Sequence, residues 1–362
     1  MLLKRLMTNI LKKLASVKIT GFCILWLFVL TFWGTVAQVS QGLYAAQERY
    51  FFSFFFKVWG VIPFPGAQGV LWVMFINLCA SSIVHFSKLR TWRSAGLKLT
   101  HIGILIYFVA AFATFHLTQE SNLHLMEGES TNVGTSYAEW EMASWKEDAQ
   151  GKQISAHDLN KLRSGDLFML DGKKIAIVQF YLNCEAFRTN EGKQSIINSS
   201  GIDMLSAMPV NKEREKNIAG GIFMINDQKV LLYGAESNAT RIGDRYYTVR
   251  LKRFPLPFTL KLKKFKAKFH PGTNVASSYE SLVEMIKPNA VREVRIYMNN
   301  PLREKDYTFY QASYSTDEKG RQYSTLAVVK NAGQMLPYIA CFVVFFGLAL
   351  HFILAALDRK RS

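Results

Sequence analysis

Four stretches of this sequence contain no Asp, Glu, Lys or Arg over 19 or more consecutive residues. A helix needs about 20 apolar residues to cross the hydrocarbon core of a lipid bilayer, and charged side chains are costly inside that core. The pattern therefore predicts a membrane protein with four transmembrane α-helices, over residues 19–38, 66–86, 99–117 and 334–357.

The basic residues between these stretches predict the orientation of the chain. Cytoplasmic loops of membrane proteins carry an excess of Lys and Arg. Such residues cluster in three segments, which we expect in the cytoplasm: 1–18, 87–98 and 358–362. The interfacial segment 39–65 and the large segment 118–333 then lie outside. The chain is thus expected in the bacterial inner (cytoplasmic) membrane, with its large domain on the periplasmic side.

The positive charge of the chain belongs mostly to the segments that flank the apolar stretches. The whole sequence has a formal net charge of +17, whereas residues 118–334 carry 30 Lys and Arg against 25 Asp and Glu. Basic residues beside membrane helices set topology and contact anionic lipid headgroups. The charge therefore indicates a lipid bilayer as the partner and argues against a nucleic acid.

The large external segment shows the sequence signals of strands. Short runs rich in β-branched and aromatic residues, partly alternating with polar ones, cover residues 175–182, 245–251, 260–269 and 294–298. The alternation shifts by one residue at Lys263-Lys264, which predicts a β-bulge. Turn-forming pairs separate the runs: Asp171-Gly172, Gly220-Gly221 and Pro271-Gly272. We expect a large β-rich, sandwich-like domain between the third and fourth helices.

Two further helical segments are expected outside the four spans. The aromatic-rich stretch Gly42–Val61 predicts an amphipathic helix along the outer interface, ended by Pro63 and Pro65. The residues Ser277–Ile286 indicate a helical piece within the external domain.

Signatures of soluble enzymes are absent from the sequence. It contains no GxSxG, P-loop or HExxH motif and no CxxC pair. Only Cys184 of the four cysteines lies outside the apolar stretches, and we interpret it as a small buried side chain rather than a redox thiol. Four histidines of the external part are not spaced like metal ligands and are interpreted as surface or structural: His116, His124, His157 and His270. No acid, base or nucleophile is assigned to this chain.

The most informative single residue is His101, near the cytoplasmic end of the third apolar stretch. An ionisable side chain in a membrane helix is costly, so it tends to face the bundle interior or a cavity. Neutral imidazole is also an axial ligand of haem iron. Gly103 follows two residues later, and small residues allow the close approach of another helix or of a flat ligand.

The spacing alone leaves two interpretations of His101 open. It is either an iron ligand or an interfacial histidine that bonds to water or to a neighbouring carbonyl group. For His85 and His351, which also lie near cytoplasmic helix ends, the interfacial interpretation is the stronger one.

Several segments at both ends of the chain and in the last third of the external domain form a recognisable series. They include LTHIGILIYFVAAF (99–112), LHLMEGES (123–130), FHPGT (269–273), MNNPL (298–302) and YTFYQASYS (307–315). This series resembles the ResB family, also called CcsB, of System II cytochrome c biogenesis. The resemblance is weak over residues 135–240, and Ala332-Gly333 stands where the family usually has Pro-Gly.

The resemblance implies a function. ResB-like proteins act with a CcsA-like membrane protein, carry haem across the membrane and present it, reduced, to the CxxCH motif of apocytochrome c. A thioredoxin-like protein keeps those cysteines reduced. The family's membrane histidine corresponds to His101, which would ligate the iron of haem b together with a ligand from the partner. The chain would then be a non-catalytic or co-catalytic subunit of a haem lyase, the cytochrome c synthase.

A second hypothesis comes from a different class of protein. The chain would be a cofactor-free, membrane-anchored scaffold that docks apocytochrome or another partner through its external domain. Trp140 and Trp145 are isolated, so the sequence lacks the tryptophan cluster of the partner family and this subunit should not complete the haem ligation alone. The basic strand Lys261–Lys268 is either a contact for an acidic partner or a solvated face.

Overall fold

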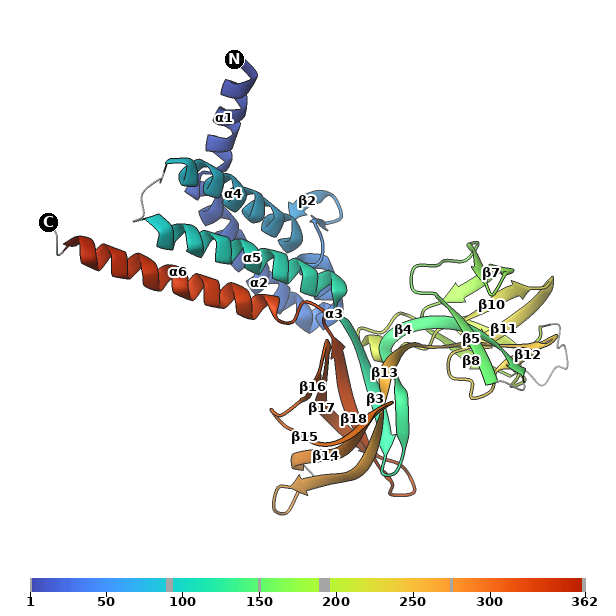
Figure 1. Cartoon of the computed structure of the whole chain (residues 1–362). Coiled ribbons are helices and arrows are strands. Elements are labelled where there is room, and N and C mark those ends of the chain that lie inside the picture. Colours follow the sequence, from blue (N-terminus) through green and yellow to red (C-terminus); the bar gives the residue numbers. More distant parts are fainter. Residues whose placement is uncertain (1, 89–93, 149–150, 189–195, 274–275, 360–362) are drawn as a thin grey trace. The chain divides into compact units, whose positions relative to one another are not determined.

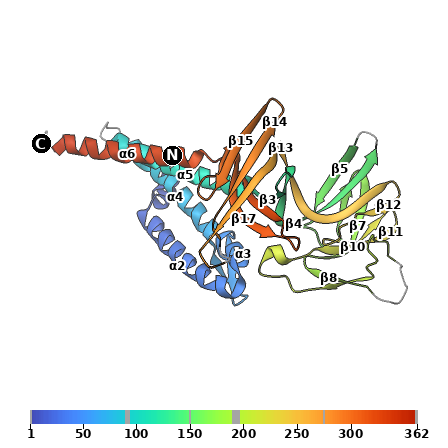
Figure 2. The ribbon, with the colours of Figure 1, turned by 90° about the horizontal axis from the view of Figure 1, so that it is seen from below.

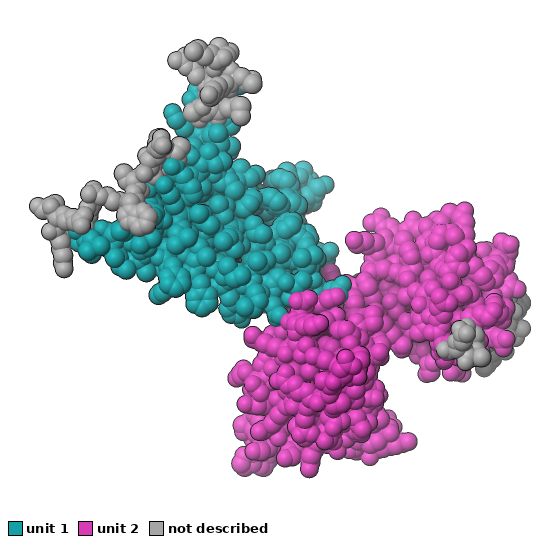
Figure 3. Space-filling model, in the orientation of Figure 1, with its two compact units in different colours: residues 1–119, 331–362 teal, residues 120–330 magenta. Residues whose placement is uncertain are grey.

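The computed structural model describes the chain apart from residues 1, 89–93, 149–150, 189–195, 274–275 and 360–362. The chain divides into two compact units, which Figure 3 colours separately. Residues 1–119 and 331–362 form a helical membrane unit, and residues 120–330 form a β-rich unit. The large β-rich domain thus lies in the sequence between the third and fourth apolar helices, as predicted.

Four helices of the membrane unit are long and apolar enough to cross a bilayer. They are α2 (Val17–Gln41), α4 (Ala67–Lys88), α5 (Ala95–Leu117) and α6 (Leu336–Arg359), and each overlaps one of the four predicted stretches (Figure 1). Many of their large apolar side chains are exposed, as expected for helices that face lipid. The protein is therefore a multi-pass membrane protein.

A buried amide connects the N-terminal part of the chain to the second span. The helix α1 (Leu2–Leu14) precedes α2, and the turn between them contacts Asn77 of α4. Asn77 is buried, accepts a hydrogen bond from the Thr20 hydroxyl at 2.7 Å and donates to the carbonyl oxygens of Ser16, at 3.0 Å, and Leu14. Because these bonds satisfy the amide, it holds the start of α2 against α4 at little cost in hydrocarbon.

The segment between α2 and α4 is not one amphipathic helix, and the prediction for Gly42–Val61 is wrong beyond Phe51. A short α3 (Leu43–Ala46) and a π-helical turn, η1 (Gln47–Phe51), lead into a hairpin of β1 (Phe55–Val58) and β2 (Ile62–Pro65). Trp59 and Gly60 reverse the chain at positive φ, which a helix cannot accommodate.

The aromatic residues of this segment bury themselves on α2. Tyr50 and Phe56 pack edge to face at 4.9 Å, and both contact Trp33 of α2. Phe64 of β2 stacks on Trp26, whose indole N–H donates to the Pro65 carbonyl at 2.9 Å. The segment therefore gains stability from packing that the linear pattern of apolar residues did not reveal.

Helices α5 and α6 lie side by side along their length and are in close contact through glycines (Figures 1 and 2). A methyl group on Gly103 would lie 2.8 Å from the backbone nitrogen of Val344, and one on Gly96 would lie 2.7 Å from the Gly347 carbonyl oxygen. Such distances are too short for a side chain, so only glycine allows the two backbones to approach this closely. Small residues thus determine which face of α5 meets α6.

The β-rich unit contains one large sheet and two smaller ones. The large sheet has the order β15-β14-β13-β4-β3-β18-β17-β16, with β12 paired to β13 and β5 to β4. Its strands are β3 (Gln119–Met126), β4 (Ser130–Asp148), β5 (Gly151–Asp158), β12 (Thr240–Ile242), β13 (Arg245–Phe269), β14 (Ala276–Lys287), β15 (Ala290–Tyr297), β16 (Leu302–Glu304), β17 (Tyr307–Thr316) and β18 (Gln322–Lys330). The smaller sheets contain β6 (Leu167–Leu170), β7 (Lys173–Tyr181), β10 (Gly220–Ile225) and β11 (Gln228–Tyr233), and the pair β8 (Cys184–Phe187) and β9 (Met204–Ala207).

Two hydrophobic cores share the long strand β13. One core lies between two sheets. The first half of β13 covers the β6-β7-β10-β11 sheet together with β12 and β4, and this core includes Tyr247, Phe223 and Ile177. We call this part the Tyr247 lobe, and its two facing sheets form a sandwich. The second half of β13 belongs to another core, around Phe309 and Leu326, which we call the Phe309 lobe. Figure 2 shows β13 as one continuous band through both lobes.

The strand pairing confirms some local predictions and overturns others. The register of β13 against β14 shifts between Leu262 and Lys264, which confirms the predicted bulge. Asp171-Gly172 forms the two-residue turn between β6 and β7 with both residues at positive φ. The helical piece predicted for Ser277–Ile286 is wrong, because these residues pair as β14 between β13 and β15, where Ser281, Val283 and Met285 are buried.

The pair Gly220-Gly221 is not a turn. Both glycines lie inside β10, where a methyl group on Gly220 would lie 2.8 Å from the Cys184 sulfur and one on Gly221 would lie 2.5 Å from the Gln179 carbonyl oxygen. Glycine is needed here for close packing and not for chain reversal.

Replacing Gly103 by Ala is expected to destabilise the membrane unit. The added methyl group meets the Val344 backbone, so α5 and α6 must separate, at a cost of about 1–3 kcal/mol. The control is Gly21→Ala in α2, where no atom lies within 4 Å of the added carbon. Thermal unfolding of the full-length protein in detergent should show a lower midpoint for Gly103→Ala only. Equal midpoints for both variants would contradict the close α5–α6 contact.

A second prediction concerns an ion pair of the β4–β13 ribbon. Arg250 Nε donates to Glu141 Oε1 at 2.9 Å, and Glu141 is only 5% exposed. Arg250→Met leaves a buried carboxylate unpaired, at a cost of about 3 kcal/mol. This corresponds to a fall of about 6–12 °C in the unfolding midpoint, measured by circular dichroism of the strands. The double variant Glu141→Leu/Arg250→Met should recover part of the loss, and a double variant less stable than Arg250→Met would contradict the account.

Candidate functional site

His101 lies on α5, and its side chain faces α4. It follows the first residue of α5, Ala95, by six positions, which corresponds to about 9 Å along the helix. The imidazole is half-buried, with its Nδ1 atom 3.3 Å from the Ser82 hydroxyl oxygen. The Phe86 ring stands at a steep angle to the imidazole, with centroids 5.9 Å apart. One hydroxyl and one aromatic ring of α4 therefore surround the imidazole within the helix pair.

Two different faces of α5 have two different roles. Gly96, Thr100 and Gly103 face α6, so these small residues accommodate a helix and not a flat ligand. The face toward α4 carries His101 and then two aromatic residues. Phe108 contacts Phe75 at 5.9 Å, and Phe112 contacts Trp72 at 5.5 Å. The α5–α6 packing thus turns His101 toward α4.

The contact with Ser82 has a chemical consequence for the imidazole. A neutral histidine carries its proton on one ring nitrogen and a lone pair on the other. When Nδ1–H donates to the Ser82 oxygen, the lone pair lies on Nε2, and metal-bound histidines use this arrangement to fix tautomer and ring orientation. The His101–Ser82 pair can therefore orient a neutral imidazole for an electrophile such as iron.

Ser82 was missed by sequence reasoning, although a signal existed. The second and third spans run antiparallel, so residues at similar depth from their cytoplasmic ends become neighbours. Ser82 lies four residues before the end of the predicted stretch 66–86, close to the depth of His101. A comparison of polar residues at similar depth in adjacent spans would have predicted that Ser82 lies beside His101.

Three of the other histidines pack against neighbouring side chains, and His270 is exposed. His116 packs against Phe112 at 4.3 Å, His157 stacks on Phe168 at 4.5 Å, and His124 Nδ1 lies 3.1 Å from the Thr325 hydroxyl. His351 Nδ1 is buried, and within the described residues no hydrogen-bond partner reaches it. The side chain of His85 lies outside the described residues.

Cys184 is a buried core residue of β8. It is 2% exposed, its thiol lies 3.6 Å from the Ile218 carbonyl oxygen, and burial raises its pKa to about 12. A thiol with so high a pKa is almost never a thiolate and is a poor nucleophile. In the described part of the chain, no three His, Cys, Asp or Glu side chains lie close enough together to hold a metal ion.

Comparison with known proteins connects this fold to a family. The model of the ResB-like family matches residues 217–322, from just before β10 to the first residue of β18. Over this stretch the chain is similar to the ResB-like family. The match includes the segments FHPGT, MNNPL and YTFYQASYS, on which the resemblance was based.

The chain is also similar to a curated protein, Protein NrfI of Wolinella succinogenes. The two sequences are 26% identical over 310 residues, which cover 78% of this chain and 29% of the relative. The chain therefore spans less than a third of the length of that relative. The family match and this similarity agree with the resemblance noted in the sequence.

The α4–α5 geometry predicts which residues can be cross-linked. In a variant whose four native cysteines are replaced by alanine, Ser82→Cys/His101→Cys should react with a short bifunctional thiol reagent, because the two native side chains are in contact. The control pair Ser82→Cys/Ile102→Cys should react far less, since Ile102 is 42% exposed on the next position of the helix. Mass spectrometry of the linked peptides measures both yields. A higher yield for the control pair would contradict the orientation of His101.

Proposed function

We propose that this chain is a haem-handling subunit of a System II cytochrome c synthase. With a CcsA-like partner, it helps carry haem across the bacterial inner membrane and presents it for covalent attachment to apocytochrome c. The ResB-like family match and the similarity to NrfI support this proposal. The observation that carries it is an imidazole within an apolar helix, oriented by a hydroxyl of the neighbouring helix. Haem is the cargo of this reaction.

His101 is the proposed contact with the haem iron. Bound haem supplies the iron and the vinyl groups that react with cysteine thiols. The chain contributes one neutral imidazole, with Ser82 accepting from Nδ1 and Nε2 directed to the metal. The second ligand is proposed to come from the CcsA-like partner. Four other histidines of this chain already have neighbours: His116, His157 and His351 contact aromatic rings, and His124 contacts a hydroxyl group.

The packing around His101 is suited to hold its imidazole in one orientation. The glycine contact with α6 prevents α5 from rotating, since any turn of the helix would bring a side chain against the Val344 backbone. Phe86 covers part of the ring edge. The imidazole therefore keeps its orientation, and the loss of side-chain freedom on binding is small.

The β-rich unit is proposed to lie on the periplasmic side, where it docks apocytochrome c or shapes the haem site of the partner. A thioredoxin-like protein would keep the apocytochrome cysteines reduced. In this role the chain is non-catalytic or co-catalytic, and thioether formation takes place at the complex.

Replacing His101 by Ala is expected to abolish haem binding. The full-length protein, co-expressed and purified with its CcsA-like partner, should contain stoichiometric b-type haem, and His101→Ala should reduce the Soret band at least about tenfold because an axial ligand is lost. Added imidazole should restore the band. Ser82→Ala should retain the haem but weaken its retention about 10- to 100-fold, as is usual for residues that orient a metal ligand.

Matched histidine variants control this experiment. His116→Ala and His351→Ala should keep the Soret band, and all variants should be recovered with the partner in equal amount. Haem content unchanged in His101→Ala, with normal cytochrome c maturation, would exclude the ligand role. A complex without a Soret band under every expression condition would instead favour the cofactor-free scaffold.

A further inference from the structure

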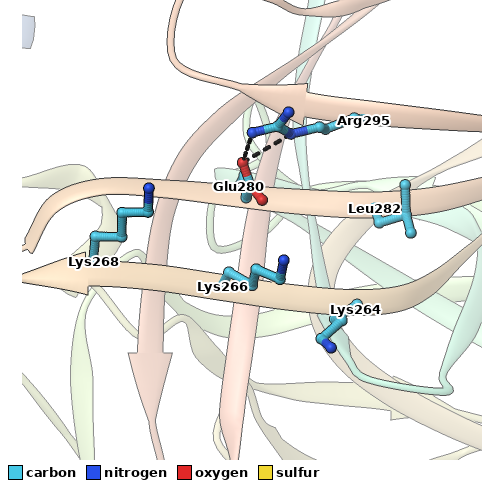
Figure 4. A pocket seen from close by; sticks show the side chains of 6 residues that line it. All are labelled: Lys264, Lys266, Lys268, Glu280, Leu282 and Arg295. Carbon is cyan, nitrogen blue, oxygen red and sulfur yellow. Dashed lines mark hydrogen bonds and ion pairs between the residues drawn. The ribbon is translucent and has the colours of Figure 1, made fainter.

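A basic face lies on the outer side of the β13-β14-β15 sheet. We define it by six side chains that line a shallow groove: Lys264, Lys266, Lys268, Glu280, Leu282 and Arg295. Figure 4 shows these side chains on neighbouring strands, with Glu280 bound to Arg295. The groove has a volume of about 380 Å³. It is therefore large enough to accept part of another molecule.

The bulge at Lys263-Lys264 creates this face. Leu260 and Leu262 point into the core of the Phe309 lobe, and after the one-residue shift Phe265 points into the same core. Every second residue from Lys264 onward then points outward, so Lys264, Lys266 and Lys268 form one row. Without the shift, lysines and core residues would exchange faces.

The acidic residues of this sheet are already engaged by other cations. Lys263 Nζ lies 3.1 Å from Glu284 and 2.8 Å from Glu293. Glu280 stands opposite Lys266 in the register, yet its carboxylate is bound by Arg295.

Within the described residues, Lys264, Lys266 and Lys268 therefore have no ion-pair partner. Like charges about 7 Å apart in one row repel each other, so the row represents an uncompensated positive surface.

We propose that the basic face binds an acidic polypeptide segment in an extended conformation. Side chains on one side of an extended chain repeat every 6–7 Å or so, the same interval as the lysine row, so carboxylates at alternate positions can meet all three lysines. Leu282 stands between Lys264 and Arg295 in the register and gives the groove one apolar side chain. The partner is thus an acidic protein segment with Asp or Glu at every second residue.

The test measures binding of a fluorescein-labelled peptide in which Glu alternates with Thr, by fluorescence anisotropy with the full-length protein in a non-ionic detergent. A peptide of the same composition with all Glu residues in one block is the comparison. The patch variant replaces the three lysines of the row by Glu, and the control variant carries Lys212→Glu, Lys229→Glu and Lys319→Glu. The control lysines are exposed elsewhere, so both variants change the net charge equally.

The alternating peptide should bind more tightly than the block peptide, and added salt should weaken it. The patch variant should lose at least about tenfold in affinity and the control no more than about twofold. Equal losses in both variants, or equal binding of both peptides, would overturn the proposal. So would binding of the wild type to phosphatidylglycerol vesicles but not to the peptide.

This inference does not rest on the proposed haem function. His101→Ala should leave peptide binding unchanged, and the patch variant should keep its haem. Each proposal can therefore fail in its own assay while the other proposal still holds.

Discussion

The close contact between α5 and α6 is the interaction on which the membrane unit depends. Gly96, Gly103 and Gly347 remove the side chains that would keep the two backbones apart, and the contact fixes the rotation of α5 about its axis. Because residues on a helix occupy defined faces, fixing one face fixes the others. His101 consequently meets Ser82 of α4 and not α6. The orientation of one imidazole thus follows from glycines that never touch it.

A shift of one residue has a comparable effect in the β-rich unit. The strand β13 contributes residues to two cores, so it must keep its apolar residues inward over 25 residues. The bulge after Leu262 restores that alternation for Phe265 and places three lysines on the opposite face. Core packing and surface charge are therefore coupled at this site, and a change at the bulge would alter both.

The sequence alone predicted the elements whose structure follows from a single environment, such as the hydrocarbon core of the membrane. Uncharged stretches must be helical in hydrocarbon, so the four spans were predictable, and the doubled lysine identified the bulge. The sequence did not predict local structure that depends on packing against residues distant in the chain. Gly220-Gly221 looks like a turn until Cys184 packs against it, and β14 needs β13 and β15 to become a strand. Ser82 became part of the site only through the pairing of two spans.

The central claim is that His101 and a residue of a second subunit bind the same haem iron. An electron cryo-microscopy map of the chain with its CcsA-like partner, purified with haem, tests it most directly. The account predicts continuous density between the iron and His101 Nε2, with the Ser82 hydroxyl beside Nδ1. Density that places this imidazole toward lipid, or that joins the iron only to side chains of the partner, would contradict it.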